Sequence, residues 1–211
     1  MLVRTRFAPS PTGCMHIGNL RSALYSYLYA LKNNGTFILR IEDTDQKRLS
    51  EISLSNIEKT LKMFGLNYKE MYIQSERLNL YKEKAEYLVE KGYAYRDDGC
   101  IKLKIPENIN VTSDDKLRGK LTINTKELYD IILLKSDGFP TYHLASVVDD
   151  IDMKITDVFR GEEWISSLPY HSLLYKVFKH KEPNWYHLPL ILDVDGSKLS
   201  KRNQSLSLDS M

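Results

Sequence analysis

A glycine-rich turn near the start of the chain combines residue types that can bind phosphate. Gly13 and Gly18 permit a close approach of the backbone to a ligand, and His16 lies between them. The apolar spacing that follows predicts a helix from about Ile17, and the first N–H groups of a helix lack internal partners. Such a helix end attracts anions. A lone histidine is more often a surface or core residue, so the turn by itself only suggests that His16 donates to a phosphate oxygen.

A basic segment near the other end of the chain has the charge that a phosphate site needs. Residues 193–203, "DVDGSKLSKRN", carry Lys198, Lys201 and Arg202 directly after the apolar run "LPLIL". A basic cluster is usually a solvated surface. Placed after a buried strand, this cluster could instead close over a triphosphate and neutralise its charge.

Strands that alternate with helices must bring these two segments together. Residues 2–7 predict a strand, the first helix ends at "NNG" (33–35), and "TFILRI" (36–41) predicts a buried strand, which together form a β-α-β unit. Two further helices are predicted at 50–64 and 76–91, joined by a short segment around "YKEMYIQ". "TDVFRG" predicts a strand running into a helix at about 162–179, and "WYHLPLIL" predicts another strand.

The middle of the chain has a different pattern. "YAYR", "CIKLKIP" and "KLTIN" predict a small antiparallel insertion, and "YDIILLK" predicts a core strand. The whole pattern predicts an α/β fold with a Rossmann-like, doubly wound parallel sheet. Ligands of such sheets bind beyond the carboxyl ends of the strands, near the switch in strand order.

The composition fits a soluble, folded protein. Of the 211 residues, 42% are hydrophobic and 27% are charged. No apolar run is long enough to cross a bilayer and the start does not resemble a signal peptide, so we expect a cytoplasmic protein. The net charge of +2 does not indicate a strongly basic nucleic-acid binder, although charges can segregate in space. Cys14 and Cys100 have no metal-ligand spacing, so we expect neither a disulfide nor a zinc site.

Several blocks of the sequence resemble the class I aminoacyl-tRNA synthetases. "PSPTGCMHIGN" resembles their HIGH signature, and "SKLSKR" resembles their KMSKS loop. The blocks "RFAPSPTG", "LRIEDTD", "LLKSDGFPTYHLA", "FRGEEW" and "LPLILDVDGSKLSKR" are similar to bacterial-type glutamyl-tRNA synthetases and stand in that family's order. They cover nearly the whole chain except about 97–115. The related glutamyl-Q tRNA(Asp) synthetases share them.

The resemblance implies an ATP-dependent ligase. L-glutamate would attack the α-phosphate of ATP, which carries Mg²⁺, and glutamyl-adenylate would then pass its glutamyl group to the 3′ end of a tRNA. His16, Lys198 and Lys201 would be catalytic, with Lys201 the stronger of the two lysines. A single preorganised donor of this kind contributes roughly 3 kcal/mol of transition-state stabilisation.

The resemblance also implies two sets of binding residues. Arg6 would take the side-chain carboxylate of glutamate and Arg160 the other carboxylate contact, or the reverse, because a guanidinium matches a carboxylate in geometry. Glu42 would take the substrate ammonium. The full glutamate set is Arg6, Ala8, Ser10, Glu42, Tyr142 and Arg160. The ATP set is Thr12, Gly18, Asn19, Trp164, Leu190, Ile191 and Lys201.

The chain departs from the family pattern at several places. Asn19 stands where the HIGH signature has its second histidine, and Ser146 stands where the family often has asparagine. Relatives usually carry a longer insertion that holds the tRNA acceptor end, some with a zinc knob that Cys100 alone cannot rebuild. We therefore expect residues 1–95 and 129–211 to form the two halves of the catalytic domain, and 96–128 to form a reduced acceptor-binding insertion.

Two alternatives to a glutamate–tRNA ligase stay open at this point. The chain ends at Met211, soon after the KMSKS-like segment, so we expect weak tRNA charging and a possible separate tRNA-binding chain. The acceptor could differ, as in the glutamyl-Q tRNA(Asp) synthetases. The chain could also be a non-catalytic fragment or split subunit that binds ATP.

Overall fold

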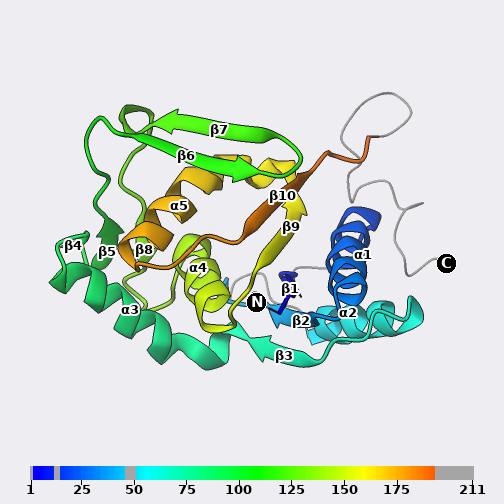
Figure 1. The fold of residues 1–211 in the computed structure, drawn as a ribbon. Helices are drawn as coiled ribbons and strands as arrows, with labels where there is room; N and C mark the ends of the chain where they lie inside the picture. The colour runs from blue at the N-terminus through cyan, green and yellow to red at the C-terminus, as the bar shows by residue number, and fades with distance from the viewer. Residues whose placement is uncertain (1, 12–14, 46–50, 193–211) are drawn as a thin grey trace.

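The predicted α/β, Rossmann-like fold is confirmed by the computed structural model, which describes residues 2–11, 15–45 and 51–192 (Figure 1). The described strands form one seven-stranded sheet in the order β3-β2-β1-β9-β10-β6-β7 and one three-stranded sheet in the order β4-β5-β8. The strands of the large sheet are β1 (Arg4–Phe7), β2 (Thr36–Ile41), β3 (Glu70–Ile73), β6 (Asn110–Asp115), β7 (Gly119–Asn124), β9 (Asp157–Gly161) and β10 (Asn184–Leu188). Those of the small sheet are β4 (Ala94–Asp97), β5 (Cys100–Leu103) and β8 (Ile132–Leu134).

Helices cover both faces of the large sheet. The α-helices are α1 (Ile17–Lys32), α2 (Glu51–Met63), α3 (Leu78–Glu90), α4 (Tyr142–Asp152) and α5 (Leu168–Val177), and the 3-10 helices are η2 (Gln74–Arg77), η3 (Thr125–Glu127) and η4 (Glu162–Ser167). Strand β2 is buried along its whole length because its alternate side chains face two separate cores. Phe37, Leu39 and Ile41 belong to the core that includes α1 and α2, whereas Ile38 belongs to the core that includes α3, α4 and α5.

The strand order reverses beside β1. From β1 the chain proceeds to β2 and β3 on one side, and later to β9 and β10 on the other, with all of these neighbours parallel. The carboxyl ends of β1 and β9 therefore flank the position at which doubly wound sheets bind ligands.

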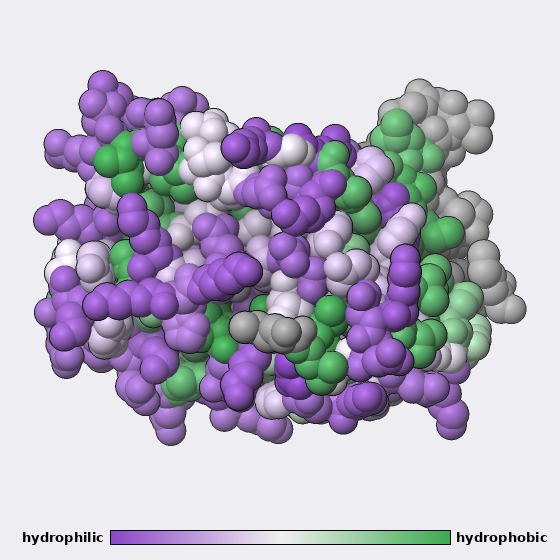
Figure 2. Space-filling view, in the orientation of Figure 1, coloured by the Kyte–Doolittle hydropathy of each residue, from purple (hydrophilic) through white to green (hydrophobic). Residues whose placement is uncertain are grey.

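Helix α1 turns an apolar stripe outward. The sequence predicts this helix correctly, but its buried residues are the small ones, Ala23, Ser26 and Ala30. The larger Leu24, Leu28 and Leu31 are 40%, 48% and 60% exposed, and hydrophobic surface gathers on the side of the molecule where α1 lies (Figure 2). Small residues let the helix approach β1 and β9 closely. Leu20 and Tyr27 pack against the core, so the large apolar residues of α1 are divided between its inner and outer faces.

The structure differs from the sequence-based prediction in part of the chain. The segment around "YKEMYIQ" contains a strand, β3, which is half-buried at the edge of the sheet and lacks a clear alternating pattern. "YDIILLK" contains the predicted core strand, β8, whose Leu133 and Leu134 are buried; it lies in the small antiparallel sheet. The predicted antiparallel segments are divided between two sheets, because β7 pairs with β6 and β6 joins the large sheet through β10. Helix α4 was not predicted.

A tight turn joins β4 to β5. Asp97 pairs with Cys100, so only Asp98 and Gly99 form the loop, with φ values of 46° and 73°. Two consecutive residues with positive φ give the type I′ geometry, which follows the twist of a hairpin and favours Asp-Gly.

Candidate active site

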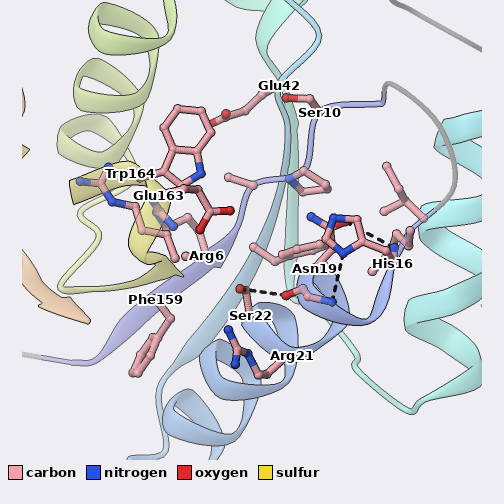
Figure 3. A pocket seen from close by; sticks show the side chains of 18 of the residues that line it. Arg6, Ser10, His16, Asn19, Arg21, Ser22, Glu42, Phe159, Glu163 and Trp164 are labelled. Atoms are coloured by element: carbon pink, nitrogen blue, oxygen red, sulfur yellow. Dashed lines mark hydrogen bonds between the residues drawn. The ribbon is translucent and has the colours of Figure 1, made fainter. Parts of the chain in front are cut away.

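A pocket opens at the carboxyl ends of β1 and β9, beside the first turn of α1 (Figure 3). Its volume is about 240 Å³. It contains twelve of the predicted site residues: Arg6, Ala8, Ser10, His16, Gly18, Asn19, Glu42, Tyr142, Arg160, Trp164, Leu190 and Ile191. The other three, Thr12, Lys198 and Lys201, lie outside the described residues. Residues far apart in the sequence therefore meet at the predicted edge of the sheet.

His16 is the N-cap residue of helix α1. Its Nδ1 accepts a hydrogen bond from the Gly18 backbone N–H at 3.1 Å, and its own backbone N–H points to Asn19 Oδ1 at 3.4 Å. A neutral imidazole that accepts at Nδ1 carries its proton on Nε2. The cap thus makes Nε2 the donor, and Asn19 contributes to the cap in place of a second histidine.

Arg40 positions two pocket residues, Glu42 directly and Arg6 through Asp150. Its guanidinium is fully buried and donates to Asp150 Oδ1 at 2.6 Å and to Glu42 Oε1 at 3.1 Å. Asp150 in turn accepts from Arg6 Nε at 3.1 Å. One guanidinium on β2 therefore fixes both Glu42 and, through Asp150, the Arg6 side chain.

The charges of this network are set by burial and by the arginines. Burial acts to raise the pKa of Asp150, but Arg40 and Arg6 lower it below its ordinary value. For Glu42 burial prevails, and its pKa is raised although Arg40 and Arg6 act in the opposite direction. A carboxylate in this condition would be stabilised by a further cation in the pocket, such as an ammonium group.

Arg160 lines the pocket from β9, the strand that pairs with β1. Its Nε donates to His187 Nε2 at 2.8 Å, its Nη1 donates to the Tyr142 hydroxyl at 3.0 Å, and its guanidinium stacks 4.8 Å from the centre of the Trp185 ring. Its Nη2 is buried and has no hydrogen-bond partner among the described residues. A buried N–H without a partner is costly, so this edge of Arg160 is suited to an anionic ligand.

Three histidines near Arg160 are neutral. Burial and the positive charge of Arg160 lower the pKa of His143 and of His187 to about 4, and they lower that of His171 well below its ordinary value. These imidazoles leave Arg160 as the cation of this side of the pocket. Trp164 forms the outer wall, with its ring 4.4 Å from that of Tyr142.

Several pocket residues were not predicted from the sequence. They are Phe7, Pro9, Met15, Arg21, Ser22, Ile57, Phe159, Gly161 and Glu163. Most are neighbours of predicted residues within the same motifs, but Ile57 comes from α2, which carries no motif. Ser146, which stands where the resembling synthetases often have asparagine, does not line the pocket; it is buried and lies 3.4 Å from Arg40 Nη2.

The described residues contain no group of side chains arranged to hold a metal ion, and Cys100 is a free, half-buried thiol. None of the helices described here is long and apolar enough to span a membrane.

Comparisons with known proteins agree with this geometry. The family described as tRNA synthetases class I (E and Q), catalytic domain, matches residues 2–100 and 98–211. A glutamate–tRNA ligase of Finegoldia magna is 42% identical in an alignment 268 residues long, which covers 98% of this chain and 55% of that protein. A glutamate–tRNA ligase of Clostridioides difficile is 41% identical in an alignment 269 residues long, which covers 99% of this chain and 55% of that protein.

Solved structures show the same likeness. A glutamate tRNA ligase from Elizabethkingia meningosepticum, crystallised in complex with its amino acid, superposes with a TM-score of 0.93 at 36% identity and covers 97% of this chain and 53% of that chain. A putative arginyl-tRNA synthetase from Campylobacter jejuni shares the fold at 13% identity, covering 95% of this chain and 57% of that chain with a TM-score of 0.64. The chain spans about half the length of the curated relatives it matches.

Proposed function

This chain belongs to the family of class I tRNA synthetases for glutamate and glutamine, and on that premise we propose that it is the catalytic domain of a glutamate–tRNA ligase. An oxygen of the glutamate α-carboxylate attacks the α-phosphorus of Mg-ATP, and the bond to pyrophosphate breaks. A ribose hydroxyl of the terminal tRNA adenosine then attacks the carbonyl carbon of glutamyl-adenylate, and AMP leaves. We place these reactions in the cytoplasm.

The observation that carries this proposal is the composition of the pocket. Its charged lining residues are Arg6, Arg21, Arg160, Glu42 and Glu163. Arg6 and Arg160 are buried and the Glu42 side chain is only 11% exposed, whereas Glu163 is exposed, so the enclosed charges are two guanidinium groups and one carboxylate. Glutamate has two carboxylates and one ammonium, which is the complementary set. Ser10 and Tyr142 add hydroxyl groups, and the backbone at Ala8 borders the same space.

The charge of the pocket would select glutamate against glutamine. Glutamine has nearly the same shape but is neutral in its side chain, so it would not give the buried guanidinium the ionic contact that the glutamate carboxylate gives. Sites built around such polar partners reject the wrong ligand by orders of magnitude. We assign Arg6 to the side-chain carboxylate and Arg160 to the other carboxylate contact, or the reverse.

The first turn of α1 would hold the phosphates. In-line displacement at phosphorus needs alignment and neutralisation of charge, which His16 Nε2, the positive end of the α1 dipole and Lys201 could supply, with Lys198 assisting. Gly18, Asn19, Trp164, Leu190 and Ile191 would bind the rest of ATP, together with Thr12. Leu190 and Ile191, which line the pocket, come shortly before Lys198 and Lys201 in the sequence.

Pyrophosphate exchange tests the proposal. We expect labelled pyrophosphate to enter ATP only when glutamate is added, with glutamine inactive, and the reaction should be run with and without tRNA. Lys201→Ala should cripple exchange with only a modest loss of ATP binding. Exchange that is absent under both conditions would contradict the enzymatic proposal and favour a module that only binds ATP.

The acceptor requires a separate measurement. The family match breaks at residues 98–100, which is the β4–β5 turn, and each alignment to the ligases is longer than this chain. We propose that the acceptor-binding insertion is reduced at this turn, so the chain contacts the tRNA acceptor end weakly. Charging of tRNA(Glu) at a rate far below exchange would support this, and a separate tRNA-binding chain would restore the rate.

A further inference from the structure

We propose that Asp115, on the hairpin formed by β6 and β7, is a positioning residue that acts through His187 to orient Arg160 in the pocket. The inference rests on the proposed function for its substrate, glutamate. It also gives this hairpin a role other than the contact with the tRNA acceptor end that the sequence predicts for residues 96–128.

The Asp115 carboxylate is fixed by four N–H groups. It is 1% exposed and accepts from His187 Nδ1 at 2.6 Å, from the His187 backbone N–H at 3.1 Å, and from the backbone N–H groups of Leu117 and Arg118 at 2.9 and 2.8 Å. Strand pairing places Asp115 opposite Trp185, which brings β6 to the end of β10. A carboxylate is only an acceptor, so it requires the proton of His187 to lie on Nδ1.

The tautomer of His187 in turn determines whether its Nε2 can accept a hydrogen bond from Arg160. The imidazole is fully buried, and with its proton on Nδ1 its Nε2 is an acceptor for Arg160 Nε–H at 2.8 Å. The opposite tautomer would place an N–H against the N–H of Arg160, and the guanidinium would have to turn away. Asp115 therefore determines which face His187 presents to Arg160.

The orientation of the Arg160 guanidinium decides which group of a ligand its Nη2 can contact. Nε is held by His187 and Nη1 by Tyr142, which leaves Nη2 as the buried donor without a described partner. A guanidinium held at two corners presents the third in one direction only. Loss of the Nε contact would loosen this corner, and the carboxylate of glutamate would lose a preorganised donor.

The experiment compares Asp115→Asn with Asp114→Asn in the full chain. Asp114 is the adjacent residue of β6, but its side chain is 61% exposed and pairs with Lys116 at the surface. We expect Asp115→Asn to raise the KM for glutamate in pyrophosphate exchange roughly 10-fold or more and to leave the KM for ATP within about 2-fold, as for a lost outer-shell contact. Asp114→Asn should change neither. Equal KM values for the two variants would overturn the inference.

A second readout does not depend on activity. In ¹⁵N-histidine-labelled protein at neutral pH, NMR should show His187 protonated at Nδ1 in the unaltered chain and in Asp114→Asn, and a mixture of tautomers in Asp115→Asn. An unchanged tautomer in Asp115→Asn would overturn the inference. If the unaltered chain shows no glutamate-dependent exchange, the proposed function fails, and the tautomer still decides the role of Asp115.

His187 supplies a test if Asp115→Asn does not fold. His187→Gln keeps an oxygen that can accept from Arg160, whereas His187→Phe fills the space without an acceptor. We expect the KM for glutamate in His187→Gln to stay within a few-fold of the unaltered chain and that in His187→Phe to rise by about 10-fold or more. Equal effects of the two substitutions would mean that His187 only fills space.

Discussion

Asp150→Asn is the substitution that should reveal the buried charge network most directly. The carboxylate of Asp150 is 2% exposed and lies 2.6 Å from Arg40 Nη1 and 3.1 Å from Arg6 Nε, whose side chains are 0% and 5% exposed. Asparagine would keep the shape and remove the charge, so two buried guanidinium groups would lose their shared counter-charge. Breaking one buried pair from one side costs about 3–5 kcal/mol.

The expected effect is large enough to measure by thermal unfolding. In a protein of this size, 1 kcal/mol corresponds to about 2–4 °C in Tm, so Asp150→Asn should lower Tm by about 6–20 °C. The matched control is Asp152→Asn in the same helix, where the carboxylate is 54% exposed and pairs with Arg77. An exposed pair contributes about 0–1 kcal/mol, so this control should lose at most about 4 °C.

A double-mutant cycle with Arg40→Met separates the pair from general damage to α4. If the two charges interact as the distances indicate, Asp150→Asn should cost much less in the Arg40→Met background than in the unaltered chain. An Asp150→Asn variant as stable as Asp152→Asn would refute the reasoning, because the buried carboxylate would then contribute no more than an exposed one.

Three further outcomes follow from the geometry. A Cβ atom at Gly18 would lie 2.8 Å from His16 Cε1, so Gly18→Ala should displace the imidazole and lower the exchange rate by about 10-fold or more. The free energy of unfolding should fall by no more than about 2 kcal/mol, the cost of a lost helix cap. The pKa of His187 is about 4 in the folded chain and near 6.5 in the unfolded one, so the unfolded state binds the proton first as the pH falls. His187 alone should contribute a loss of up to about 3 kcal/mol of stability between pH 6.5 and 4, in addition to the losses from His143 and His171, so urea unfolding of His187→Gln should lose correspondingly less than the unaltered chain over this range. A metal chelator should leave Tm unchanged but abolish exchange, because the metal enters with ATP; a chelator-induced fall in Tm would reveal a structural metal site.

Local patterns in the sequence predicted the elements and pocket residues that adjoin motifs. His16, Arg6 and Glu42 stand in or next to blocks whose residue types already suggest their chemistry, and α1 has a regular apolar spacing. The same spacing could not show that Leu24 and Leu28 face outward, because small residues provide the contact with the sheet.

The residues that support the pocket could not be predicted in this way. Arg40 and Asp150 are 110 positions apart in the sequence, and Asp115 and His187 are 72 apart. Their pairing depends on the order of the strands and on which face of β2 is covered by α4. Neither property is a local feature of the chain.

The hairpin turn at Asp98 and Gly99 has a consequence for how chains of this architecture can change in length. Because two residues close the gap between β4 and β5, the strand ends are already adjacent, and a segment of any length whose own ends meet can be grafted or excised there without displacing either strand. The entropic cost of a longer flexible loop rises by only about 0.6 kcal/mol per doubling. This turn is therefore a position at which an added segment can be gained or lost while the pocket, which is built on the other, seven-stranded sheet, is retained.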